Sequence, residues 1–118
     1  MQRFAALYPI NRGRDVPAIG RWDGDVYFGG NPWFPTTLGF AELHYRIAAR
    51  TGEAAAFARA EAWMRLVEDV APDPTAPLSE QFDRTTGTAV SCPALTWSAA
   101  AFLGAATARD DAVQALTR

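Results

Sequence analysis

The stretch from residue 35 to residue 72 reads PTTLGFAELHYRIAARTGEAAAFARAEAWMRLVEDVAP, and it predicts two consecutive helices. Pro35 suits the first turn of a helix, and Gly52 stands where a left-handed cap favours glycine. Pro72 stops whatever helix precedes it. We therefore expect one helix from Pro35 to Thr51 and a second from about Glu53 to Ala71. The tight turn between them makes the pair an antiparallel hairpin.

Apolar residues recur at helical spacing in both halves of this stretch. In the first helix they form two adjacent stripes, which predicts that it is buried on most sides. The two stripes are Leu38, Ala41, Tyr45 and Ala48, and then Phe40, Leu43 and Ile47. In the second helix, Trp63 belongs to the apolar side and is expected in the core.

Outward from this hairpin the chain alternates between loops and further helices. A long loop rich in Gly, Pro, Asn and aromatic residues precedes it over 8–34, and a second loop covers 72–91. A third helix is expected from Pro93 to about Ala106, and a shorter fourth from Asp110. No strand pattern of convincing length is present, so the predicted fold is all-α. The rhythm suits a toroid of helical hairpins.

Composition limits the classes of function. The chain has 118 residues, 49% of them hydrophobic, with a net charge of -2, which indicates a packed domain or part of one. No cluster of basic residues suggests a nucleic-acid surface, and no apolar run is long enough for a membrane span. The first residues lack the apolar stretch of a signal peptide. The single cysteine, Cys92, is expected as a small core residue.

Glu80 is the main candidate for chemistry. It lies in the second loop in the segment Leu78-Ser79-Glu80-Gln81-Phe82-Asp83, between two helical regions. A carboxylate there can face a ligand while its neighbours hold it by hydrogen bonds. The alternative is a solvent-exposed loop glutamate without a role.

Arg21 and Asp25 form a second candidate group in the first loop. The planar fork of an arginine binds sugar hydroxyls or a carboxylate, so Asp25 either orients Arg21 for a ligand or only stiffens the loop. Loop tryptophans such as Trp22 and Trp33 suggest carbohydrate binding, because indoles stack on sugar rings. His44 has no second metal ligand nearby in the sequence, and a structural role is expected for it.

An ordered set of segments is similar to the glucoamylases of glycoside hydrolase family 15. The segments are Ile19-Gly20-Arg21-Trp22-Asp23-Gly24-Asp25-Val26-Tyr27, Gly30-Asn31-Pro32-Trp33-Phe34, Ser79-Glu80-Gln81-Phe82-Asp83, and Ser91 through Leu95-Thr96-Trp97. The resemblance starts near Tyr8 and spans nearly the whole chain. It implies an (α/α)6 barrel, of which residues 1–118 would be the C-terminal portion with only the last helical hairpins.

The resemblance also implies a reaction and roles for single residues. Glucose would be released, with inversion, from the non-reducing ends of starch-like α-1,4-glucans or malto-oligosaccharides. Glu80 matches the general base, and Ser91 matches a serine that hydrogen-bonds the base. The residues that match sugar-binding positions are Arg21, its supporter Asp25, Trp33 and Trp97. No metal or organic cofactor is implied.

One departure from the family pattern is large. The general acid of the family lies in an earlier Trp-Glu-Glu-like loop, which these 118 residues do not contain. The chain would therefore be a piece of a longer enzyme or an inactive remnant. A non-catalytic regulatory or interaction module on the same scaffold remains the alternative, as does a trehalose or dextran hydrolase. The compartment is left undecided.

Overall fold

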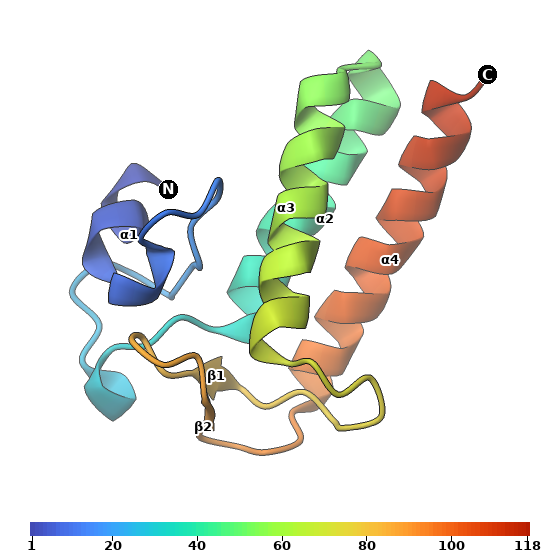
Figure 1. Ribbon diagram of the computed structural model, residues 1–118. Coiled ribbons are helices and arrows are strands. Elements are labelled where there is room, and N and C mark those ends of the chain that lie inside the picture. Colours follow the sequence, from blue (N-terminus) through green and yellow to red (C-terminus); the bar gives the residue numbers. More distant parts are fainter.

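The computed structural model describes all residues from 1 to 118, and three long helices dominate it (Figure 1). They are α2 (Phe34–Thr51), α3 (Ala54–Val70) and α4 (Thr96–Leu116). The short α1 (Gln2–Leu7) and two 3-10 turns (Pro9–Asn11 and Tyr27–Gly29) lie in the N-terminal region. Strands β1 (Gln81–Phe82) and β2 (Ala89–Val90) pair in antiparallel fashion at the base of the helices.

The predicted hairpin of α2 and α3 is confirmed. Gly52 caps α2 in the left-handed conformation with φ of 74°, and its N–H donates to the carbonyl of Ala48 at 2.8 Å. Only glycine adopts such a φ without steric cost, so the turn is sharp enough to send α3 back along α2. The second helix ends at Val70, just before Pro72, as the sequence indicates.

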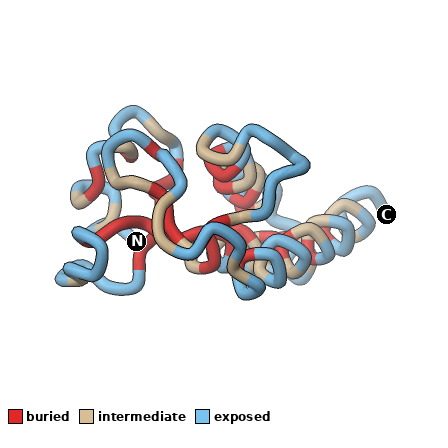
Figure 2. The backbone as a smooth tube through the Cα atoms, turned by 90° about the horizontal axis from the view of Figure 1, so that it is seen from below, coloured by how far each residue is buried: buried red, intermediate tan, exposed pale blue.

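Helix α2 is the centre of the helical layer, because it packs against both α3 and α4. Many of the buried residues on the three helices are alanines, which lets the helices approach closely. The buried alanines are Ala41 and Ala48 on α2, Ala56 and Ala60 on α3, and Ala105, Ala108 and Ala112 on α4. Buried residues lie along the middle of the backbone in Figure 2, whereas the C-terminal end of α4 is largely exposed.

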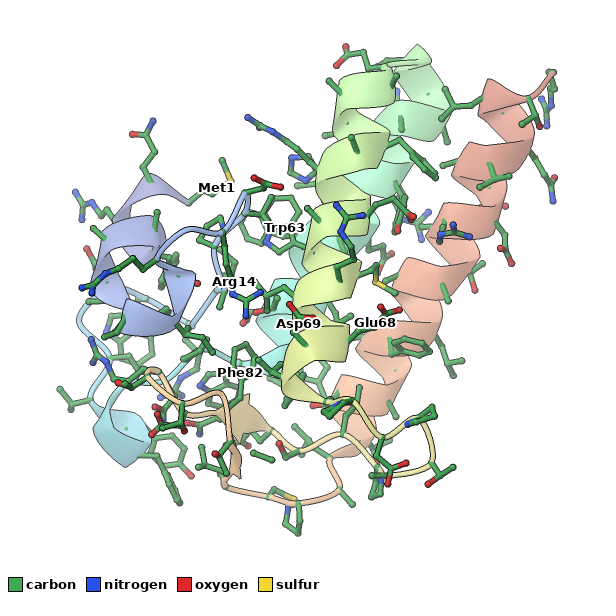
Figure 3. All side chains as sticks on the ribbon, in the orientation of Figure 1. Met1, Arg14, Trp63, Glu68, Asp69 and Phe82 are labelled. Carbon is green, nitrogen blue, oxygen red and sulfur yellow. The ribbon has the colours of Figure 1, made fainter.

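Polar links join the helices to each other and to the N-terminal loop. The hydroxyl of the buried Tyr45 donates to Glu61 on α3, and Arg109 of α4 donates to the same carboxylate at 2.6 Å. The expected core residue Trp63 is fully buried, and its indole N–H donates to the carbonyl of Pro17 at 2.8 Å. Figure 3 shows Arg14 of the same loop beside Asp69 on α3, an ion pair of 2.9 Å.

The C-terminal helices are predicted incorrectly. A single helix of 21 residues runs from Thr96 to Leu116, where two helices were expected. Residues 107–109, between the two expected helices, include no glycine or proline that would end a helix. Ala108 and Ala112 are buried in the helical layer, which favours one continuous helix. It also starts three residues after Pro93. The two-residue strands of the β-hairpin were not predicted.

Two burial predictions are also wrong. Leu43 is 49% exposed, because α2 has neighbours in this chain on only some of its sides. Cys92 is exposed, as are its neighbours Pro93 and Ala94, in the turn that leads to α4. No helix of the chain is long and apolar enough to cross a membrane.

Candidate active site

Glu80 is fixed by its backbone at the end of the layer where α2 and α4 begin. Its carbonyl accepts a hydrogen bond from the N–H of Phe34, the first residue of α2, at 3.0 Å. Its own N–H donates to the carbonyl of Cys92 at 2.9 Å. Two residues further on, Phe82 is fully buried and packs on Phe34 with ring centroids 4.8 Å apart. The segment around Glu80 is therefore held on both sides and anchored in the core.

The Glu80 carboxylate is held through one of its two oxygens. Oε1 accepts hydrogen bonds from the Ser91 hydroxyl at 2.8 Å and from the side-chain amide of Gln81 at 2.8 Å. Oε2 accepts none within the chain. Ser91 has φ of 67°, a left-handed conformation that is costly for a residue with a side chain. The backbone is thus strained at the residue that directs its hydroxyl to Glu80.

Arg21 and Asp25 form a two-pronged ion pair, as the sequence suggests. Nε and Nη2 of Arg21 donate to the two oxygens of Asp25 at 2.8 and 2.9 Å, and the Tyr27 N–H donates to Asp25 at 3.0 Å. The hydrogen bonds from Arg21 and from the Tyr27 backbone hold the pKa of Asp25 below its ordinary value. Nη1 of Arg21 makes no hydrogen bond within the protein.

Glycine is required beside this pair. Gly30 has φ of 76°, and a Cβ added to it would collide with the carbonyl oxygen of Asp25. The close approach of the two backbones closes the loop that carries Arg21. Position 30 is therefore restricted both by its φ and by its neighbour.

Aromatic rings connect Arg21 with Trp97. The guanidinium carbon of Arg21 lies 4.7 Å from the ring centroid of Trp33 and 5.1 Å from that of Tyr27. Trp33 is buried, and its ring centroid lies 6.0 Å from that of the half-exposed Trp97. The indole N–H of Trp33 has no hydrogen-bond partner in the chain.

The backbone connects the segment of Glu80 with the aromatic residues beside Arg21. The pKa of Arg21 is raised first by its hydrogen bond to Asp25, and the negative charge of Glu80 adds to this effect. The backbone also joins the two groups, because Trp33 pairs with Gln81 in an antiparallel bridge. Hydrogen bonds, an ion pair, aromatic contacts and the Trp33–Gln81 bridge therefore link the six residues that the resemblance assigns to the site, namely Arg21, Asp25, Trp33, Glu80, Ser91 and Trp97.

Sequence reasoning missed the residues that lie between these two loops. Asn31 Nδ2 donates to the Phe28 carbonyl at 2.8 Å and to the side-chain oxygen of Gln81 at 3.3 Å. Arg84 donates to the carbonyls of Leu7, Gly29 and Gly30. No local pattern predicts the contact of Asn31 with Gln81 or those of Arg84, because these partners are 50 or more residues apart.

His44 takes no part in this site. Its Nδ1 lies 2.9 Å from the Phe40 carbonyl, and its ring packs on Trp63 with centroids 4.7 Å apart. Both partners belong to the helical hairpin, which agrees with the structural role expected for His44. No group of three or more His, Cys, Asp or Glu side chains that could hold a metal ion is present.

Comparison with known proteins identifies relatives of this chain. The model of the family "Glycosyl hydrolases family 15" matches residues 1–107. Glucoamylase P of Amorphotheca resinae is 33% identical over 85% of this chain and 23% of its own length. Glucoamylase-1 of Arthroderma benhamiae is 31% identical over 95% of this chain and 25% of its own length.

A solved structure extends the similarity to the fold. The glucoamylase of Hormoconis resinae superposes with a TM-score of 0.80 at 31% identity, over 92% of this chain and 25% of that one. This confirms the prediction of an all-α fold that forms part of an (α/α)6 barrel. The chain spans about a quarter of the length of the relatives that it matches.

Proposed function

The chain belongs to the glycosyl hydrolases of family 15, and we propose that it forms the C-terminal portion of a catalytic domain that releases glucose from α-1,4-linked glucans. The relatives that the chain matches are glucoamylases. Residues 1–118 would carry the general base and part of the sugar site. The general acid would come from residues outside these 118.

The observation that supports this proposal most is the asymmetry of the Glu80 carboxylate. Ser91 and Gln81 both donate to Oε1, while Oε2 accepts no hydrogen bond within the chain. A general base needs one oxygen that can accept a proton from water and a side chain that does not turn away. We infer that Oε1 fixes the orientation of the carboxylate and that Oε2 takes the proton.

Arg21 and the aromatic residues suit the binding of a terminal glucose unit. Asp25 occupies Nε and Nη2 of Arg21 and leaves Nη1 for a sugar hydroxyl. Trp97, 54% exposed, offers an indole surface of the kind on which sugar rings pack. Trp33 lies between the two and holds them apart at a fixed spacing.

The reaction then follows the inverting pathway. Glu80 Oε2 removes a proton from a water molecule as the oxygen of that water attacks the anomeric carbon. The bond to the leaving oxygen breaks, and an acid on the other face of the sugar protonates it. In inverting enzymes the two carboxyl groups lie about 6.5–9.5 Å apart, which leaves room for the water. No residue of this chain is assigned as the acid.

Part of the surface of the chain is apolar, and we expect the rest of such a domain to pack against it. An apolar cleft of about 730 Å³ lies between the end of α3, the loop that follows it and α4. Phe102 and Leu103 line it and are 41% and 66% exposed. We expect residues 1–118 alone to release no measurable glucose from maltose, because the acid contribution of about 10²–10⁴-fold is missing.

The test is a pair of substitutions in the complete catalytic domain, with steady-state kinetics on maltose. Glu80→Gln keeps the shape and the hydrogen bonding but cannot take the proton, so kcat should fall by about 10²–10⁴-fold with little change in KM. Arg21→Ala should lower kcat and raise KM, because its donors hold the sugar throughout. Glu53→Gln, at the exposed turn between α2 and α3, is the matched control and should leave both unchanged.

Two results would contradict the proposal. A near-normal kcat for Glu80→Gln would remove the general base and favour a regulatory or interaction module. An α-anomer as the first product, detected by NMR, would show retention of configuration and would exclude water activation by Glu80 as written.

A further inference from the structure

Two buried amides, Gln81 and Asn31, connect the Glu80 carboxylate with the loop that carries Arg21. Gln81 is fully buried and Asn31 is 5% exposed. We propose that they are positioning residues for the reaction, with Asn31 setting which end of the Gln81 amide faces Glu80. This inference rests on the proposed role of Glu80 as the base.

The orientation of the Asn31 amide is fixed by the backbone. Its Oδ1 accepts from the N–H of Arg84 at 3.2 Å, and its Nδ2 donates to the carbonyl of Phe28 at 2.8 Å. A backbone N–H can only donate and a carbonyl can only accept, so these two partners allow one orientation of the amide. Phe28 adopts a left-handed φ of 51°, in the turn that follows Asp25.

The fixed amide of Asn31 determines the orientation of the next one. Asn31 Nδ2 also donates to Gln81 Oε1 at 3.3 Å, so the other end of the Gln81 amide, Nε2, points to Glu80 Oε1 at 2.8 Å. If Gln81 were flipped, two NH2 groups would face each other and its oxygen would face the carboxylate. No water reaches Gln81 to compensate, so the flipped state is costly.

The hydrogen bonds from Asn31 through Gln81 to Glu80 form a relay, and this relay has a direct consequence for Glu80. With the NH2 of Gln81 and the hydroxyl of Ser91 both on Oε1, Oε2 is left for the reacting water. The same hydrogen bonds join β1, which follows Glu80, to the Phe28–Asn31 turn, which follows Asp25. The relay therefore also fixes how the base lies relative to the sugar-binding loop.

The test uses Asn31→Asp, with Asn11→Asp as a matched control. Asn11 is 6% exposed, its Nδ2 donates to two carbonyls at 2.8 and 3.3 Å, and its Oδ1 accepts from a backbone N–H at 2.7 Å. It differs from Asn31 in having no link to Gln81 or Glu80. Both changes replace an amide by a carboxyl of the same shape, so their effects on folding should be similar.

Asn31→Asp should turn Gln81 around, so that the amide donates to residue 31 and its oxygen faces Glu80. We expect kcat on maltose to fall by about tenfold to a hundredfold, the effect of losing one hydrogen bond to a charged group. KM should stay within about twofold, since Arg21 and Trp97 are untouched.

Asn31→Asp adds a negative charge at residue 31, whereas Gln81→Met removes the donor to Glu80 without adding a charge. In the unmodified chain, the negative charge of Glu80 acts on Arg21, and Arg21 forms an ion pair with Asp25. Asn11→Asp should lower the thermal unfolding temperature without lowering kcat. If both Asp variants give the same kcat and the same KM, the relay is refuted.

A second variant decides the matter if Asn31→Asp does not fold. Gln81→Met keeps the volume but removes the donor to Glu80, and it should lower kcat by about tenfold or more at similar KM. A kcat within about twofold of the unmodified enzyme would refute the role of Gln81. Glu80→Gln, measured alongside, separates the proposed role of Glu80 as general base from the proposed role of the relay. If it is active, the proposed function fails; if it is inactive while both amide variants are normal, only the relay fails.

Discussion

Ser91 offers a way to separate strain from catalysis at one residue, through the pair Ser91→Ala and Ser91→Gly. Both changes remove the hydroxyl that donates to Glu80 Oε1 at 2.8 Å. Only glycine also relieves the left-handed φ of 67°, which costs a residue with a Cβ about 1–2 kcal/mol. The two variants should therefore match in activity and differ in stability.

The magnitudes follow from the contacts. A hydrogen bond to a charged group contributes about 1.5–3 kcal/mol, which would be about 10- to 150-fold in rate if all of it acted on the transition state. Because Gln81 still holds Oε1, we expect the lower end, about tenfold in kcat for both variants. Ser91→Gly should be about 1 kcal/mol more stable than Ser91→Ala.

The assay combines steady-state kinetics on maltose with urea unfolding of the complete catalytic domain. Equal losses of kcat, together with a higher unfolding midpoint for the glycine variant, would support the reasoning. Two outcomes would refute it: an unchanged kcat in both variants, or a glycine variant no more stable than the alanine variant. The first would mean that the hydroxyl does not orient Glu80, and the second that φ at position 91 stores no strain.

Two further predictions concern stability. Tyr45→Phe removes the hydroxyl that donates to Glu61 inside the helical layer, and it should cost about 1 kcal/mol of unfolding free energy with no change in kcat; a loss of activity would contradict a purely structural role. Hydrogen bonds from their arginine partners hold the pKa of Asp25 below 3.8 and the pKa of Glu61 below 4.5. The two ion pairs therefore contribute fully to the free energy of unfolding above these ordinary pKa values. That contribution is lost as the pH falls through the lower pKa values of the folded state. Thermal unfolding followed by circular dichroism should show a nearly constant midpoint above about pH 5 and a decline below about pH 4. Arg21→Ala should weaken that decline, and an equally steep decline would show that the Asp25 pair does not contribute.

The helical hairpin was predictable because its signals are local. Gly52 and Pro72 end the helices through their own backbone chemistry, whatever lies around them. The end of α4 was mispredicted because Asp110 and Asp111 resemble a helix start. In the structure the helix continues through them, with Ala108 and Ala112 buried on either side.

The candidate site was predictable only through the ordered set of motifs. Nothing in the local sequence of Glu80 distinguishes a base from an exposed loop glutamate, and the resemblance supplied that distinction. The partner of the Asn31 amide could not be predicted, because Gln81 is 50 residues away and its burial is a tertiary property. The same holds for the exposure of Leu43 and Cys92.

The exposed position of Cys92 has a practical consequence. It is the single cysteine of these 118 residues, and its backbone carbonyl accepts the N–H of Glu80 at 2.9 Å. Within these 118 residues, a fluorophore or spin label that reacts with thiols would attach at one known position. Because the side chain points away from the core while the backbone is tied to Glu80, such a label would report on the segment of Glu80 in real time as sugars bind and leave.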